Sequence, residues 1–114
     1  MRLVYHLVVP ADYERHRAGD YRADSLAAEG FIHCSNRDQV AWVANQFYAA
    51  LPELWLLSID AERLTSPLRD EDPGIGVRFP HVYGPINREA IQVVVPLSRG
   101  PDDKWLCPEL PLDS

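Results

Sequence analysis

The chain has 114 residues, of which 46% are hydrophobic and 25% are charged. This length and composition predict one globular domain with a core of its own. The net charge of −6 argues against a sequence-independent nucleic-acid binder, which needs clustered Lys and Arg. No apolar run is long enough to span a membrane, and the N-terminus does not resemble a secretion signal, so we expect a cytoplasmic protein. Two cysteines without CxxC spacing suggest neither a disulfide scaffold nor a zinc site.

The first half of the chain predicts two strands and two helices. Arg2 to Val9 reads as an opening strand, and Pro10 to Gly19 as a short helix with proline first and glycine after its end. Tyr21 to Ala28 is weakly patterned and is expected to be a loop. Gly30 to Ser35 then reads as a strand that leads into the main helix. One face of that helix carries apolar residues at three- and four-residue steps: Val40, Val43, Ala44, Phe47 and Leu51.

The second half predicts more strands and one exposed loop. Leu54 to Ile59 is almost continuously apolar, as expected for a strand at the centre of a sheet. Leu68 to Glu71 reads as a brief extended piece, and Asp70 to Arg78 as a surface loop rich in Gly, Pro and acidic residues. Phe79 to Asn87 begins as another short strand, and Ile91 to Leu97 as the last one.

These elements predict the α+β class rather than a wound parallel sheet. We expect a small single domain over residues 1–97, with a split, mainly antiparallel sheet, one main helix and one short N-terminal helix. Residues 98–114 form a proline-rich tail in this interpretation, and Trp105 and Leu106 could attach it to the domain. Neither GxGxxG nor GxxxxGK[ST] is present, so the two commonest phosphate-binding loops are not expected.

Two histidines are the main candidates for chemistry. His33 and Ser35 share one face of their strand, and His81 and Tyr83 share one face of theirs. If both faces line one cleft, an imidazole could transfer protons near neutral pH and the hydroxyls could orient a ligand. The alternative is structural: Ser35 suits a helix cap, and Tyr83 suits a packed aromatic with a satisfied hydroxyl.

Other combinations of residues give weaker evidence for a functional site. A triad of Ser35, His81 and an acid lacks the glycine-flanked turn of a nucleophilic serine, and a metal site of His33, His81 and Glu71 lacks a close ligand pair. Three arginines could hold an anion bidentately or simply face solvent: Arg22, Arg69 and Arg78. Trp42 and Trp55 are interpreted as packing residues rather than base-stacking platforms, and Cys34 as a buried small hydrophobe.

Four motifs resemble the domain-of-unknown-function 952 family of small bacterial proteins. They are GFIHCS at Gly30–Ser35, VANQFY in the helix, LLSID at Leu56–Asp60 and FPHVYGPIN at Phe79–Asn87. Their order and spacing match from about Leu3 to Leu97. That family looks related to the ADP-ribosyltransferase-like fold, which has a split β-sheet and a cleft for a nicotinamide dinucleotide.

The resemblance implies a cleft lined by His33, Ser35, His81 and Tyr83, and it gives His6 the place of a first-strand histidine. The late glutamate of ADP-ribosyltransferases has no counterpart before Glu89, although Glu71 could serve from a loop. We therefore expect a small-molecule ligand that bears a phosphate or a nucleotide, with the cofactor and the oligomeric state left open. The protein is either an enzyme of ADP-ribosyltransferase-like ancestry or a non-catalytic binding or interaction module. The catalytic candidates are His33 and His81, and the ligand-binding candidates are Ser35, Tyr83, His6, Arg69, Arg78 and Glu71.

Overall fold

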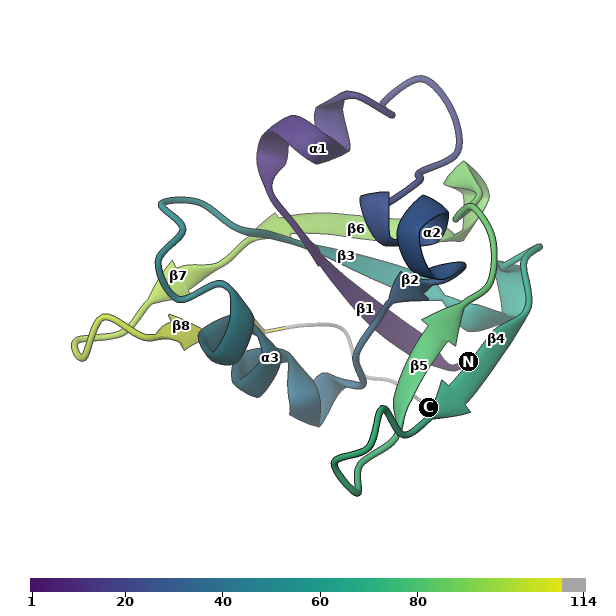
Figure 1. Cartoon of the computed structure of the whole chain (residues 1–114). Helices are drawn as coiled ribbons and strands as arrows, with labels where there is room; N and C mark the ends of the chain where they lie inside the picture. The colour runs from purple at the N-terminus through teal and green to yellow at the C-terminus, as the bar shows by residue number, and fades with distance from the viewer. Residues whose placement is uncertain (110–114) are drawn as a thin grey trace.

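A computed structural model describes residues 1–109 of the chain. The strands are β1 Leu3–Val8, β2 Ile32–His33, β3 Trp55–Asp60, β4 Leu68–Glu71, β5 Phe79–Val82, β6 Ile91–Pro96, β7 Ser98–Arg99 and β8 Trp105–Leu106. The α-helices are α1 Pro10–Glu14, α2 Asp24–Glu29 and α3 Val40–Phe47, and the 3-10 helices are η1 Arg37–Gln39, η2 Ala61–Arg63 and η3 Arg88–Ala90. The domain combines antiparallel sheets with few helices, as the α+β prediction required (Figure 1).

The larger sheet has the strand order β1-β3-β6 and is antiparallel throughout. Its middle strand is β3, the almost continuously apolar segment, so the prediction that this strand is central is confirmed. Residues of β3 alternate between the two faces, and each face carries one half of the hydrophobic core. The buried residues of one half include Val4, Leu57, Ile59 and Val82, and those of the other include Tyr5, Val40, Ala44, Leu56 and Trp105.

The smaller sheet has the order β2-β5-β4, again antiparallel. It meets the larger sheet where Tyr5 and Ser35 exchange two backbone hydrogen bonds, of 2.9 and 2.7 Å. The sheet is therefore split, as expected from the sequence. This contact fixes the position of β2 beside β1, so the strand that carries His33 cannot shift independently of the core.

Helix α3 and the segment before it differ in detail from the prediction. Asn36, not Ser35, caps the helical segment that begins at Arg37, and its backbone amide donates to the Gln39 side chain at 2.8 Å in a capping box. Val40 and Ala44 are buried as predicted, but Phe47 is 66% exposed. The predicted apolar face is thus split between the core and an open surface.

The N-terminal helices also depart from the expected boundaries. Helix α1 ends at Glu14 rather than near Gly19, and the predicted loop before Gly30 contains α2. Helix α2 ends at Gly30, whose φ of 90° is a left-handed conformation that glycine adopts without strain. This turn delivers the chain into β2.

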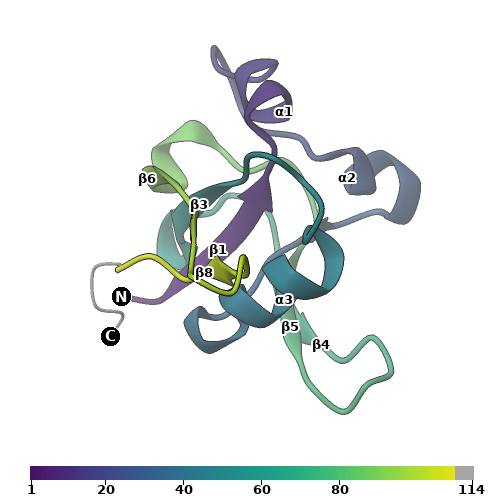
Figure 2. The same ribbon diagram turned by 90° about the vertical axis from the view of Figure 1, so that its left-hand side faces the viewer.

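Residues beyond Leu97 fold back onto the domain as far as they are described. Strands β7 and β8 pair as a short hairpin next to α3 (Figure 2). Trp105 is only 3% exposed, whereas Leu106 is 49% exposed, so of the two residues expected to attach this segment only Trp105 is buried in the core. No helix within residues 1–109 is long and apolar enough to cross a membrane.

Candidate functional site

Strands β2 and β5 bring the two predicted histidines together. In their antiparallel register His33 lies opposite His81, and the ring centroids are 5.4 Å apart with an edge-on orientation. Strand β4 pairs on the other side of β5 and places Glu71 near His81. Four of the expected residues, from three strands and the turn after β5, therefore gather on one face of the small sheet: His33, Glu71, His81 and Tyr83.

Glu71 holds both His81 and Tyr83. Its Oε1 accepts a hydrogen bond from His81 Nδ1 at 2.9 Å and one from the Tyr83 hydroxyl at 2.5 Å. Both bonds stabilise the carboxylate and lower the pKa of Glu71, the Tyr83 bond most strongly, and the same bond raises the pKa of Tyr83. Glu71 is therefore an anion and Tyr83 a donor at neutral pH. Because an ionised carboxylate can only accept, His81 carries its proton on Nδ1 and Nε2 is left as the basic nitrogen.

His33 has a glutamate of its own. Its Nε2 donates to Glu29 Oε2 at 2.9 Å, and the two residues lie one turn apart across the end of α2 and the start of β2. Phe31 packs among the polar rings, stacked on His81 at 4.2 Å and edge-on to His33 at 4.8 Å. The site thus holds two histidine–glutamate pairs in contact with one aromatic ring.

A cavity of about 840 Å³ opens beside this cluster. Its polar lining residues include the two histidines, Ser35 and Gln46. The rest of the lining is mostly apolar and comes from β1, the residue after β2, α3 and the residue after it, the loop between β4 and β5, and the start of β5. It consists of Leu7, Cys34, Trp42, Val43, Phe47, Tyr48, Pro73, Ile75, Val77 and Phe79. Burial raises the pKa of the Cys34 thiol to about 12, so this cysteine is neutral and weakly reactive.

Trp42 and Trp55 have different environments. Trp55 packs against the core, as predicted. Trp42 is 49% exposed, packs against the rings of Phe47 and Phe79 and lines the cavity, so it is a partly buried packing residue rather than a core residue. The sequence could not predict the exposure of Trp42, because it does not show which parts of the α3 surface other elements cover.

Of the expected ligand-binding residues only Ser35 lines the cavity: Tyr83, which was expected to line the cleft, and Glu71 lie beside it, and His6, Arg69 and Arg78 lie outside the lining. His6 is buried between β1 and β2, where Nδ1 donates to the His33 carbonyl at 2.6 Å and Nε2 accepts from the Tyr21 hydroxyl at 2.9 Å. Arg69 lies over the ring of Tyr83, with its guanidinium carbon 4.8 Å from the centroid. Arg78 is exposed at the base of the β4–β5 loop, and its carbonyl accepts a hydrogen bond from Gln39.

Two members of the cluster were missed by the sequence reasoning. Glu29 had a usable signal, since it precedes His33 by four residues, but it fell between the predicted loop and the predicted strand. Phe31 has the parity of His33, yet its contact with His81 depends on how β2 and β5 pair. In residues 1–109 no group of three or more His, Cys, Asp or Glu side chains is arranged to hold a metal ion.

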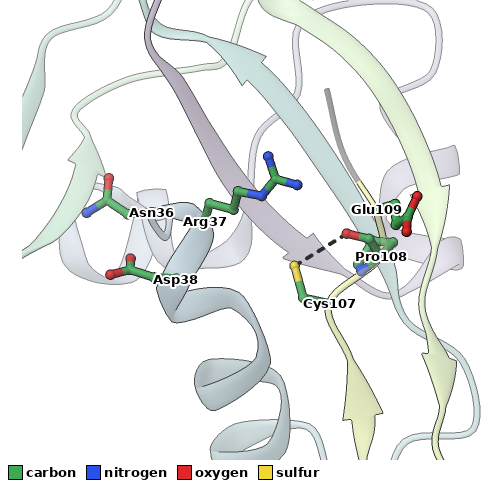
Figure 3. A pocket seen from close by; sticks show the side chains of 6 residues that line it. All are labelled: Asn36, Arg37, Asp38, Cys107, Pro108 and Glu109. Atoms are coloured by element: carbon green, nitrogen blue, oxygen red, sulfur yellow. Dashed lines mark hydrogen bonds between the residues drawn. The ribbon is translucent and has the colours of Figure 1, made fainter. Parts of the chain in front are cut away.

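A second, more open pocket of about 640 Å³ lies between η1 and the segment after β8. Figure 3 shows the Arg37 side chain directed toward the Cys107–Glu109 segment, whereas Asn36 and Asp38 point away from it. The polar groups do not converge on one point. We therefore take the cavity beside the histidines as the candidate site.

Comparisons with known proteins support the fold and leave the chemistry open. The model of one family, described as "Protein of unknown function (DUF952)", matches residues 8–94. The crystal structure of protein CC0527 from Caulobacter crescentus is similar, with 28% identity, a TM-score of 0.81 and coverage of 91% of this chain and 93% of that one. The solution NMR structure of CC0527 gives 28% identity, a TM-score of 0.76 and 91% coverage of both chains. The search of curated proteins gave no match.

Proposed function

The chain belongs to the DUF952 family, and from its own site we propose that it binds a small organic molecule in the cavity and exchanges a proton with it through His81. One observation carries this proposal: Glu71 accepts from both His81 Nδ1 and the Tyr83 hydroxyl, beside a cavity that His81 lines. A carboxylate that fixes the imidazole tautomer leaves Nε2 as a positioned base. Within residues 1–109 this nitrogen has no hydrogen-bond partner.

His33 supplies the second imidazole. It lines the same cavity, and its Nε2 donates to Glu29 Oε2 at 2.9 Å, which fixes the orientation of the ring. Two histidines on one wall can divide the work of accepting and donating a proton, which suits acid–base chemistry on one bound molecule. His33 is the more exposed of the two, so it can exchange protons with solvent between cycles.

A relationship to the ADP-ribosyltransferase-like proteins is part of this proposal. The split pair of sheets and the gathering of His33, Ser35 and His81 at one cavity support it. For this reason nucleotide and NAD-related compounds are the first to be tested.

The test is a thermal-shift screen against NAD, ADP-ribose, nicotinamide, nucleoside phosphates and phosphorylated sugars, repeated on His81→Gln and Glu71→Gln. A ligand at about a hundred times its Kd stabilises the folded protein by roughly 2.7 kcal/mol, which raises Tm by several degrees. Each ligand found is then incubated with the protein and followed by proton NMR. We expect turnover that falls about a hundredfold or more in His81→Gln.

The control is Glu53→Gln, an exposed glutamate outside the site, which should leave both binding and turnover unchanged. Ligand binding without turnover in the unmodified protein would contradict the catalytic part of the proposal. It would favour instead a non-catalytic binding module, the alternative that the exposed aromatic rings at the cavity mouth support.

A further inference from the structure

We infer that the ligand of this cavity is an uncharged aromatic molecule with one hydrogen-bonding group, such as a carbonyl, and not a phosphorylated one. This inference rests on the proposed function and names its ligand class. The hydrogen-bonding group would meet His33, Ser35 and His81, and the ring would lie against the apolar wall.

The first argument is the charge of the lining. No Arg, Lys, Asp or Glu occurs among the described residues that line the cavity. A phosphate that entered it would lose water without gaining the guanidinium or ammonium partner that normally replaces that water. The arginines near the site do not line the cavity. Arg69 lies over the ring of Tyr83, and Arg78 is exposed at the base of the β4–β5 loop. A net charge of −6 adds no attraction for an anion.

The second argument is the uncovered apolar surface. The exposed large hydrophobic residues of the described chain are six, and four of these line this one cavity: Trp42, Phe47, Ile75 and Val77. Two come from α3 and two from the β4–β5 loop, which protrudes beside α3 in Figure 2. Such a concentration of exposed apolar side chains marks a binding surface. A ligand with an apolar body would cover both walls together.

The third argument is the geometry of the rings. Trp42 and Phe79 are near-parallel, with an interplanar angle of 28° and centroids 6.3 Å apart, and Phe47 meets Trp42 edge-on at 6.0 Å. Flat faces and ring edges of this kind favour an aromatic guest over an aliphatic one of equal size, because offset stacking adds to simple burial. His33 lies opposite His81 in the small sheet and Ser35 follows two residues after His33, so one hydrogen-bonding group on the ring suffices to meet these three residues.

The experiment compares matched probes by isothermal titration calorimetry. 2-Naphthamide and 2-naphthyl phosphate share a ring and differ in charge, and benzamide and cyclohexanecarboxamide share an amide and differ in aromaticity. We expect the naphthyl amide to bind about tenfold or more tightly than the phosphate, and benzamide more tightly than its saturated analogue. Tighter binding of the phosphate, or equal binding of the two amides, would overturn the inference.

Three variants locate the binding. Trp42→Ala and Phe47→Ser alter exposed side chains and should weaken 2-naphthamide about tenfold, whereas Leu106→Ala removes an equally exposed apolar side chain outside the cavity and should not. Unchanged affinity in both cavity variants would contradict the assignment. So would a dimer in size-exclusion chromatography that Phe47→Ser dissociates, because a second copy would then cover the patch.

The same titrations separate this inference from the proposed function. If 2-naphthamide binds in a manner that needs Trp42 but no aromatic ligand is ever turned over, the ligand class stands and the catalytic role of His81 fails. If turnover of a phosphorylated compound depends on His81, the acid–base proposal stands and the ligand class fails.

Discussion

At the residue scale, His6 supports the site without lining it. The imidazole is buried and neutral: it donates from Nδ1 to the His33 carbonyl and accepts on Nε2 from Tyr21. Burial is the main reason that its pKa falls from 6.5 to about 4. The hydrogen bond to the His33 backbone fixes β2, so the buried first-strand histidine positions the exposed second one.

This lowered pKa predicts an acid-sensitive fold. The unfolded chain binds the His6 proton at higher pH than the folded chain does, so the contribution of neutral His6 is intact above about pH 6.5 and is lost as pH falls toward 4. The loss corresponds to about 3 kcal/mol of unfolding free energy. Urea unfolding at pH 7 and pH 4.5 should show most of it. His6→Gln keeps a donor and an acceptor but does not titrate.

In His6→Gln the loss of unfolding free energy between pH 7 and pH 4.5 should be smaller than in the unmodified protein, by most of the roughly 3 kcal/mol expected for His6. The carboxylates with lowered pKa, Asp70, Glu71 and Asp72, affect both proteins equally and at lower pH. Equal pH dependence in the two proteins would show that His6 is not the titrating group.

At the element scale, the loop between β4 and β5 is organised by one side chain. The Asp72 carboxylate accepts hydrogen bonds from the backbone amides of Gly74, Ile75 and Gly76, between 2.7 and 3.1 Å. Gly74 and Gly76 have φ of 112° and 82°, conformations that other residues rarely adopt. These hydrogen bonds give the loop a defined conformation, which holds its apolar side chains at the cavity.

Asp72→Ala should loosen this loop without unfolding the domain. Because the loop is exposed, we expect only a small loss of stability. Hydrogen exchange at the three amides should speed up, while exchange in β3 should not change. The exchange rates of these amides in Asp72→Asn, which keeps one acceptor oxygen, should lie between those of the unmodified protein and those of Asp72→Ala. Unaltered exchange in Asp72→Ala would mean that the strands alone define the loop.

The alternation of residues within each short strand predicted which side chains share a face. His33 and His81 were placed on their strand faces from parity alone, and in the structure both line one cavity. Parity could not show that His33 lies opposite His81, since that depends on a pairing between segments 48 residues apart. Similarly, α2 was missed because the sequence before Gly30 lacks a periodic apolar face, and no residue of that helix is buried.

At the scale of the whole molecule, the two larger sheets enclose the core and leave one side of α3 uncovered. The β1-β3-β6 sheet has one half of the core on each of its faces, and the β2-β5-β4 sheet is attached to it where β1 meets the residues after β2. The sequence predicted the central strand because β3 is apolar on both faces. It could not predict the cavity, which exists only where α3, the small sheet and the β4–β5 loop approach without filling the space between them.

The segment after Leu97 was predicted as a tail held by Trp105 and Leu106, and the contacts of Trp105 make it part of the folded unit. The indole donates from Nε1 to the Tyr48 carbonyl at 2.9 Å, and the Trp105 backbone exchanges two hydrogen bonds with the Asn45 side chain. Arg99 lies over the ring at 3.8 Å. Residues outside the family match at 8–94 therefore complete one half of the core.

This arrangement predicts opposite outcomes for two tryptophans. Trp105→Ala leaves a hole in the core and removes the indole donor to the Tyr48 carbonyl, so we expect a loss of about 3–5 kcal/mol of unfolding free energy. Trp42→Ala removes a half-exposed ring at the cavity mouth and should cost about 1 kcal/mol or less. Urea unfolding followed by circular dichroism measures both. Similar losses in the two variants would mean that the segment after Leu97 does not belong to the cooperative core, and that α3 is held by the large sheet alone.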